Sequence, residues 1–243
     1  MRRCHHSYLG ATRHPWPCLL FVLPLLLAYE VGVIWLGGTQ PDALRNGADA
    51  WLRWGLETFG LSQLYGAPAL VALFFLGWSW LRFGDRPDDP VGVLAGMAVE
   101  SAAFALGLWG LSRAMEPLLS RPGPQAAGGV PSEELIGRVI TFLGAGIYEE
   151  VLFRLLIFSG LARLLRHLEL PRGPALPLAA GASAALFAAA HHVGPYGEPF
   201  HNGVFLFRTL AGLYFAALYR FRGFGVAAGA HAGYDVLVGA IGG

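Results

Sequence analysis

Long apolar runs, each of about 18–22 residues, are the feature that most constrains how this chain can fold. A helix of about 20 apolar residues crosses the hydrocarbon core of a membrane, and short polar stretches separate these runs. Apolar residues make up 55% of the chain and charged residues only 14%, which is too few to cover a water-facing surface. The mean hydropathy of +0.50 agrees, so the pattern predicts an integral membrane protein.

The runs predict an all-α fold, a polytopic transmembrane helix bundle of about seven spans. The predicted spans are residues 18–37, 64–81, 91–112, 135–158, 175–193, 203–219 and 223–242, with boundaries good to about four residues. Because no long polar block is left over, we expect residues 1–243 to form a single membrane-embedded domain.

Two connecting segments have distinctive compositions. Residues 41–60 combine Trp51 and Trp54 with Asp49 and other charged residues, which is typical of a helix lying in the membrane interface. An ordinary amphipathic loop helix would show the same pattern. Residues 120–132 are rich in Pro and Gly and predict a loop.

The arginines predict the orientation, because Arg and Lys are retained on the cytoplasmic side and this chain contains no Lys. The N-terminal tail and the second, fourth and sixth loops hold ten arginines, whereas the first and third loops hold four. The ten are Arg2, Arg3, Arg13, Arg82, Arg86, Arg163, Arg166, Arg172, Arg220 and Arg222; the four are Arg45, Arg53, Arg113 and Arg121. We therefore expect a cytoplasmic N-terminus and an external C-terminus.

Charge and cysteine content argue against several kinds of partner. The net charge of +1 and the lack of a basic stripe interleaved with aromatics give no reason to expect nucleic-acid binding. Cys4 and Cys18 have neither a disulfide framework nor a metal-ligand spacing, so we expect free thiols.

Glu149, Glu150 and Arg154 stand among apolar residues of the fourth predicted span, where each charge costs about 2.5–3.5 kcal/mol on insertion scales. Glu150 and Arg154 are spaced i and i+4 with the acid first, the favourable order for an ion pair on one helix face. Glu149 points about 100° away and is therefore free to act as a general base. The alternative for this span is a purely structural buried ion-pair cluster.

The fifth and seventh spans carry further polar groups at one-turn spacing. Phe187 and His191 lie near the end of the fifth span, and His231 and Asp235 share a face of the seventh. Each His could be a structural residue, hydrogen-bonded across the bundle. Together with Glu149 they form an active-site pattern in which water is the expected nucleophile, because no Ser or Cys stands beside a His within a span.

Three motifs in these spans resemble those of the CPBP family, the CAAX-protease and bacteriocin-processing intramembrane endopeptidases. The family's E-E-x-x-x-R is similar to Glu149-Glu150-Val-Leu-Phe-Arg154 and its F-x-x-x-H to Phe187-Ala-Ala-Ala-His191. Its H-x-x-x-N/D is similar to His231-Ala-Gly-Tyr-Asp235. The motifs occur in the family's order within residues 135–243, the motif-bearing core, and the first 130 residues carry none.

The resemblance implies a peptidase mechanism and a role for each matching residue. Glu149, helped by His191, would activate a water, while His231 and Asp235 would bind the developing oxyanion. Arg154 would hold Glu150 and the helix. Because an ionised Asp can only accept hydrogen bonds, Asp235 either is protonated or orients His231.

The sequence leaves the cofactor, the substrate and a second class of function open. We expect no cofactor, with zinc held by Glu149, His191 and His231 as the minority alternative. The expected partners are the lipid bilayer and a peptide or protein cut close to the membrane. High Ala, Gly, Arg and Pro without Lys suggests a bacterial inner membrane, where bacteriocin leaders or membrane-anchored sorting tails are candidate substrates. The alternative is a small proton- or cation-coupled transporter that uses Glu100, Glu149, His191 and Asp235.

Overall fold

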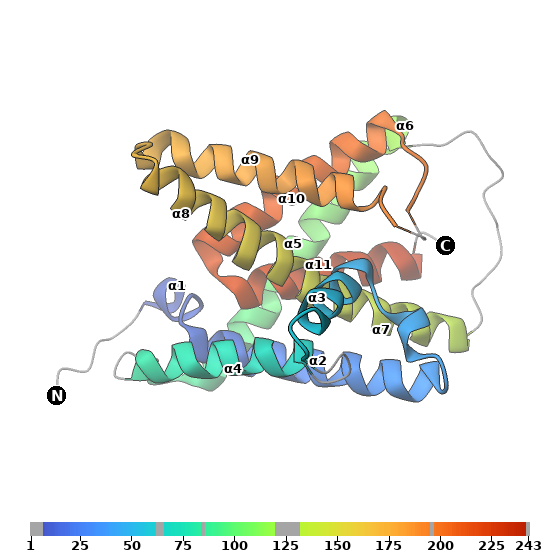
Figure 1. The fold of residues 1–243 in the computed structure, drawn as a ribbon, viewed down its shortest axis with the longest axis horizontal. Helices are drawn as coiled ribbons and strands as arrows, with labels where there is room; N and C mark the ends of the chain where they lie inside the picture. The colour runs from blue at the N-terminus through green and yellow to red at the C-terminus, as the bar shows by residue number, and fades with distance from the viewer. Residues whose placement is uncertain (1–6, 62–65, 84–85, 120–131, 195–196, 242–243) are drawn as a thin grey trace.

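The structure is a computed structural model that describes residues 7–61, 66–83, 86–119, 132–194 and 197–241, and these residues form helices joined by loops, with no strand (Figure 1). The long helices are α2 (Pro15–Gly37), α4 (Gly66–Leu81), α5 (Pro90–Ala114), α7 (Ser132–Glu149), α9 (Arg172–Ala190), α10 (Asn202–Arg222) and α11 (Phe224–Ile241). The shorter ones are α1 (Tyr8–Ala11), η1 (Pro41–Leu44), α3 (Gly47–Glu57), α6 (Glu116–Leu119) and α8 (Ser159–His167). A π-helix, η3 (Glu150–Phe158), continues α7 into α8.

Side-chain caps and prolines set where the spanning helices begin. His14 accepts a hydrogen bond from the backbone N–H of Trp16 at the start of α2, and Asp89 accepts one from Gly92 at the start of α5. Pro15 and Pro90 follow these caps, where their missing N–H costs no intrahelical bond. The caps and the prolines therefore fix the residue at which each of these two apolar helices begins.

The long helices lie where the sequence predicts spans, but the predicted count of about seven is not confirmed. Four of the described helices, α2, α5, α9 and α10, are long and apolar enough to cross a membrane. α4 is apolar but has only 16 residues, and α7 carries several charges. α7 and α11 pack against several other helices, so their neighbours replace part of the lipid that an isolated span would contact.

Connections between the described helices lie at both ends of the bundle (Figure 1). α1, the turn from α8 to α9 and the turn from α10 to α11 lie toward the left-hand end of that view. The connections from α2 to η1 and from α9 to α10 lie toward the right. The predicted loop at residues 120–132 lies outside the described residues up to residue 131, as does Cys4, whereas Cys18 is a free, buried thiol.

α11 and α7 approach each other so closely that only glycine fits at one contact. A Cβ on Gly146 of α7 would meet the backbone nitrogen and the Cβ of Ala232 at 2.6 Å, and the carbonyl oxygen of Ala228 at 2.8 Å. Such distances are shorter than van der Waals contact, so the α7 backbone rests directly on α11. This contact lies less than one turn from the polar residues of both helices.

Large apolar side chains cover much of the outer surface. Trp35 of α2, Trp80 of α4 and Val99 of α5 are 77%, 78% and 71% exposed, and many Leu and Phe side chains are likewise exposed. Monomeric soluble proteins rarely show so much contiguous apolar surface, whereas lipid tails solvate it well. The surface therefore fits a membrane protein.

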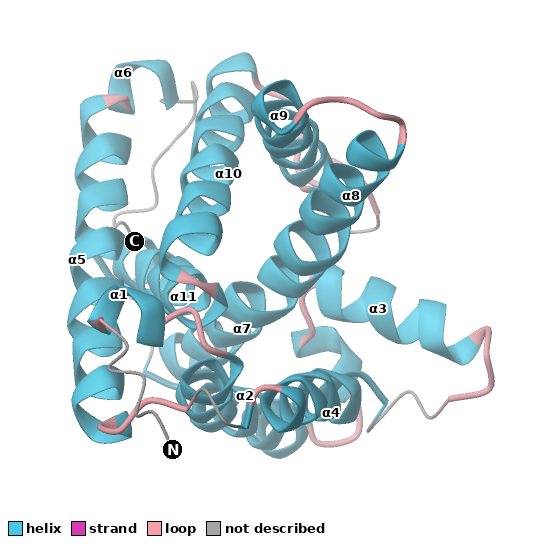
Figure 2. Cartoon of the chain, turned by 90° about the vertical axis from the view of Figure 1, so that its left-hand side faces the viewer, coloured by secondary structure: helices cyan, strands magenta, loops and turns pink. Residues whose placement is uncertain are grey.

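α3 presents two of its three charges inward, and its aromatics and Glu57 outward. Asp49 and Arg53 are buried, while Trp54 is 69% exposed. α3 packs against α7 and α4 at the edge of the bundle (Figure 2). Protein carboxylates and arginines rather than water therefore solvate Asp49 and Arg53, while the position of this helix in the membrane interface stays a prediction.

Candidate functional site

Glu149 and Glu150 stand at the junction between α7 and the π-helix η3. A π-helix widens the turn and frees backbone carbonyls, and such segments often occur at functional sites. The hydroxyl of Ser183 donates to the Phe153 carbonyl at 2.6 Å, and that of Ser159 donates to the Arg154 carbonyl at 3.0 Å. These two bonds stabilise the irregular segment from α9 and from α8.

His231 of α11 is held by Glu150. Its Nδ1 lies 2.9 Å from Oε1 of Glu150, so Nδ1–H donates to the carboxylate, and both side chains are buried. The Phe215 ring of α10 stacks on the imidazole at a centroid distance of 4.4 Å. The imidazole therefore has a fixed tautomer and plane, with Nε2 left to face the site.

His191 follows the last turn of α9 and has a fixed tautomer as well. Its Nδ1 lies 2.8 Å from the carbonyl oxygen of Phe187, one turn earlier, and donates to it. In the neutral ring Nε2 then carries a lone pair, and it lies 4.0 Å from Oε2 of Glu149. Phe187 thus contributes a backbone acceptor and a ring that packs edge-on against His191.

Glu149 lies between the two imidazoles. Its Oε2 is 3.7 Å from Nε2 of His231 and 4.0 Å from Nε2 of His191. Both distances are too long for a direct hydrogen bond and suit one bridging water. Oε2 is buried without a hydrogen-bond partner among the described residues.

Arg154 lies behind Glu150 and compensates its charge. Nη1 is 3.2 Å from Oε1 of Glu150, and Nη2 donates to the carbonyl of Gly212 at 3.3 Å. The guanidinium also lies 4.5 Å above the centre of the Phe187 ring. Because Arg154 and Glu150 are only 1% and 0% exposed, they form a support that the reactants cannot reach.

Asp235 lies on the same side of His231 as Glu149. Its Oδ2 is 3.6 Å from Nε2 of His231, the nitrogen that Glu149 also faces. The other ring nitrogen is taken by Glu150. The carboxylate that orients the imidazole is therefore Glu150, a contact the sequence did not predict.

A cavity of about 440 Å³ opens beside Glu149. It is lined by Glu149, Phe153 and His191, by the segment around Glu198, and by residues 42–51, which include η1 and the start of α3. Glu149 and His191 are 14% and 26% exposed, so both reach this space. The N-terminal part of the chain, which carries no motif, thus forms one wall of the site.

A buried ionic network, which sequence reasoning missed, fixes that wall to α2 and α7. Tyr148, the residue before Glu149, donates to Glu30 of α2 at 2.6 Å. Arg53 donates to Glu30 at 2.7 Å and to Asp49 at 2.6 Å. Arg45 and Tyr29 also donate to Asp49, at 2.9 and 2.7 Å. The sequence did contain a sign of this network: Glu30 stands inside the first apolar run, and Asp49 and Arg53 follow it at a spacing of i and i+4.

The structure brings the predicted residues of all three motifs to one point, while their catalytic roles stay predictions. The neighbouring His192 and His201 hold loops: His192 bonds the Glu198 carbonyl, and His201 caps α10. Among the described residues, no group of three or more His, Cys, Asp and Glu is arranged to hold a metal ion.

Residues 131–237 match the sequence model of a family described as type II CAAX prenyl endopeptidase Rce1-like. The matched region contains all three motifs, and it confirms the resemblance that they indicated. Comparisons with curated proteins and with solved structures found no match.

Proposed function

We propose that this chain, whose residues 131–237 match the Rce1-like family of type II CAAX prenyl endopeptidases, hydrolyses a peptide bond with a water activated by Glu149 and His191. The substrate in this proposal is a membrane-associated or tail-anchored protein. The proposal rests on the family, on the contacts of four side chains, and on the cavity beside them.

One observation carries the proposal: Nε2 of His191 and Oε2 of Glu149, both hydrogen-bond acceptors, lie 4.0 Å apart, and this oxygen has no hydrogen-bond partner among the described residues. Nδ1 of His191 is committed to Phe187, so its Nε2 accepts, and an ionised Glu149 can only accept. A water between them can donate one hydrogen to each group. Its lone pairs then point away from both, toward the cavity where a carbonyl carbon would enter.

The hydrolysis follows from this arrangement. The water oxygen attacks the carbonyl carbon while its proton passes to Glu149, and the C=O electron pair moves onto oxygen to give a tetrahedral oxyanion. The C–N bond then breaks as the same proton is delivered to the leaving nitrogen. The products are a carboxylic acid and an amine, which exchange a proton to become a carboxylate and an ammonium, and Glu149 returns to its starting state.

His231 stabilises the oxyanion in this proposal. To donate from Nε2 while Nδ1 donates to Glu150, the ring must be a cation, and the carboxylates of Glu149, Glu150 and Asp235 surround it. A protonated Asp235 would add a second donor on the same side. Donors fixed in advance at the developing charge usually supply the largest part of such catalysis.

The cavity favours an extended peptide that reaches Glu149 from the side of η1 and α3. The matched family is named for prenylated CAAX substrates, whereas the composition of this chain points to bacterial leaders or sorting tails. We propose the class they share, a peptide cut close to the membrane.

The transporter alternative requires Glu100 to pass protons or a cation to Glu149 and Asp235. Glu100 instead pairs with Arg222, at 2.6 Å, and no contact with Glu149 or Asp235 occurs among the described residues. A continuous proton path through these groups is therefore not supported.

The zinc alternative makes a different prediction about geometry. Zinc needs ligand atoms about 2.0–2.2 Å from the metal, which would draw Glu149, His191 and His231 together around one centre. We propose the metal-free reaction, because the sequence lacks the H-E-x-x-H pattern and the roles proposed for Glu149 and His191 need no metal.

The test uses purified full-length protein in detergent or liposomes and a reporter with a membrane-proximal cleavage site. Glu149→Gln should abolish cleavage, while the control Glu57→Gln, at an exposed position of α3, should cleave at the wild-type rate. Activity that survives Glu149→Gln would sink the proposal. Loss of wild-type activity with a zinc chelator, and its return with added zinc, would replace it with the metal mechanism.

A further inference from the structure

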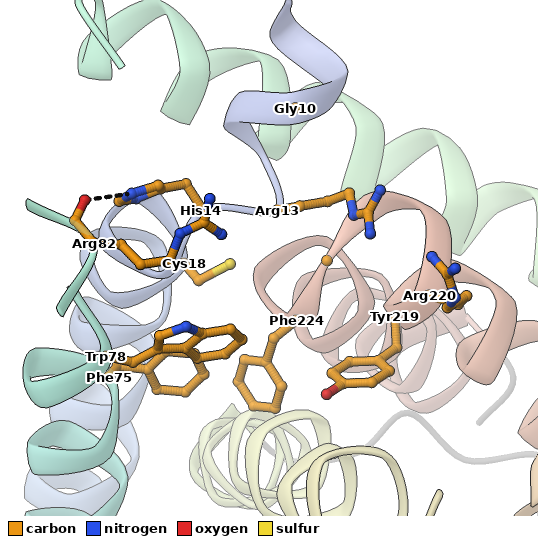
Figure 3. Close-up of a pocket in the computed structure, with 11 residues that line it drawn as sticks. Gly10, Arg13, His14, Cys18, Phe75, Trp78, Arg82, Tyr219, Arg220 and Phe224 are labelled. Atoms are coloured by element: carbon orange, nitrogen blue, oxygen red, sulfur yellow. Dashed lines mark hydrogen bonds between the residues drawn. The ribbon is translucent and has the colours of Figure 1, made fainter. Parts of the chain in front are cut away.

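A second cavity, of about 520 Å³, lies at the other end of α11 from Asp235 and shares no lining residue with the cavity beside Glu149. It lies among α1, α2, α4 and the turn from α10 to α11 (Figure 3). Its lining residues are Gly10, Arg13, His14, Cys18, Phe75, Trp78, Arg82, Tyr219, Arg220, Gly223 and Phe224. Three are arginines and none of these described residues is acidic.

The cavity has a cationic part and an aromatic part. The rings of Phe75, Trp78, Phe224 and Tyr219 lie along its lower side in Figure 3, and arginine side chains lie above and beside them. Phe75 packs against Phe224 at 4.9 Å between ring centres and stacks on Trp78 at 6.3 Å. The floor is therefore a fixed apolar surface.

Two local features bring the arginines of three separate loops together. Gly223 has a φ of +95°, and a Cβ there would lie 2.7 Å from the carbonyl oxygen of Thr12, so the turn after α10 packs directly on the residues before α2. His14 accepts from the Trp16 N–H and therefore donates through Nε2 to the Arg82 carbonyl at 3.1 Å. This bond fixes the end of α4 to the start of α2.

Two arginines of the cavity, Arg13 and Arg220, differ from Arg222 in having no ion pair among the described residues, although Arg220 lies 5.8 Å from the centre of the Phe221 ring. Arg222 is neutralised by Glu100, and Arg86 stacks on Trp16 at 4.0 Å. Arg13 and Arg220 are exposed, and within the described part of the chain no carboxylate lies within ion-pair distance of either. Their positive charge is therefore available to a ligand.

We propose that this cavity binds the phosphate of an anionic phospholipid at the membrane surface. Guanidinium groups bind phosphate oxygens with charge-assisted hydrogen bonds, and basic pockets between membrane helices bind anionic headgroups. The aromatic floor takes the glycerol and the first part of the acyl chains, and tryptophan and tyrosine suit this depth.

The position of the cavity favours a lipid over a free anion. It lies at the ends of α2 and α10, two of the helices long and apolar enough to span a membrane, so it opens where headgroups gather. The arginine distribution assigns Arg13, Arg82 and Arg220 to the same cytoplasmic side, where anionic lipids attract cationic residues. Inorganic phosphate has no apolar part that could pack on the aromatic rings, whereas a phospholipid has acyl chains.

The experiment measures binding of dioctanoyl phosphatidylglycerol to the full-length protein in neutral detergent, by native mass spectrometry and by calorimetry. Arg13→Gln and Arg220→Gln should each weaken binding about fivefold, and the double variant about 25-fold. Arg166→Gln removes an exposed arginine of α8 outside the cavity and should leave the affinity unchanged. Dioctanoyl phosphatidylcholine should bind at least about tenfold more weakly than phosphatidylglycerol.

Three results would overturn the proposal: wild-type affinity in the double variant, equal binding of the two lipids, or full displacement of the lipid by equimolar inorganic phosphate. The last would assign the site to a free anion. The thermal unfolding of each variant without lipid checks that it folds. Because binding is read without cleavage, the outcome is independent of the proposed peptidase activity.

Discussion

Glu150 accepts a hydrogen bond from Nδ1 of His231 across 81 residues of sequence, and Glu149, next to it in the chain, faces the opposite nitrogen of the same ring. Two adjacent carboxylates thus contact one imidazole from both sides. The first is compensated by Arg154 and bonded to His231, whereas no hydrogen bond to the second occurs among the described residues, and Oε2 of each is buried without a hydrogen-bond partner there. Their replacement should therefore have opposite effects on stability.

We expect Glu149→Gln to abolish turnover while thermal stability stays the same or rises, because it removes a buried charge that has no direct partner. Glu150→Gln should lower both, since Arg154 loses its counter-charge, a change that costs about 3–5 kcal/mol in buried pairs. Turnover and thermal unfolding in detergent measure the two effects. Equal destabilisation by both substitutions would contradict this division of roles.

The two histidines should differ in the size of their effect. His191→Ala removes an acceptor for the attacking water and should leave no measurable turnover, whereas losing one oxyanion donor with His231→Ala should cost about 10²–10³ in kcat. Single-turnover kinetics on folded, monodisperse variants measure the difference. Complete loss at both positions would instead point to a cage of metal ligands, which added zinc and chelators would then reveal.

Asp235→Asn separates the two roles open to Asp235. Because Glu150 already orients His231, we expect Asp235 to act as an oxyanion donor, which Asn replaces with a donor that ionisation cannot remove. The variant should keep or exceed wild-type activity and show a flatter alkaline limb in its pH profile. A clear fall in kcat at every pH would show that Asp235 supports the His231 cation instead.

Tyr148→Phe tests whether the ionic network positions the catalytic end of α7. The hydroxyl donates to Glu30, and losing a hydrogen bond to a charged group costs about 1.5–3 kcal/mol. Turnover should fall partly, because Glu149 is still present as the general base but the residue before it is no longer hydrogen-bonded to Glu30. Tyr214→Phe, which loses a bond to the Phe104 carbonyl, is the matched control and should cost about 0.5–1.5 kcal/mol with normal turnover.

Gly146→Ala tests the close approach of α7 and α11. The added methyl meets the Ala232 backbone, so the helices must separate, which costs about 1–3 kcal/mol and moves Glu149 and Glu150 away from His231. Gly137→Ala lies on the same helix with open space around it and should be neutral or stabilising by about 0.4–1 kcal/mol. The measurements are thermal unfolding and turnover. If the two variants gave the same values, the close contact at Gly146 would not explain the position of the two helices.

The sequence predicted what depends on local pattern. The apolar runs placed the long helices, because each run must bury its backbone polar groups within itself. One-turn spacings and the family's motifs selected Glu149, His191, His231 and Asp235, which the structure brings together.

What the sequence missed depends on long-range contact or on irregular backbone. A period of 3.6 residues cannot reveal the π-helix η3, whose carbonyls are bonded by hydroxyls from other helices. No pattern predicted that Glu150 would contact a residue 81 positions away. The amphipathic pattern of α3 also does not predict which of its faces packs inside. In water the apolar face is buried, whereas next to lipid the apolar face can be exposed and the charged face buried.

The ionic network around α3 also bears on how the chain enters the membrane as it is synthesised. Glu30, Arg45, Asp49 and Arg53 lie within the first 53 residues and pair with one another, so this segment contains its own counter-charges. An uncompensated charge would cost about 2.5–3.5 kcal/mol at the centre of the bilayer. These four charges can therefore be accommodated as a neutral group before Tyr148, almost a hundred residues later, has left the ribosome.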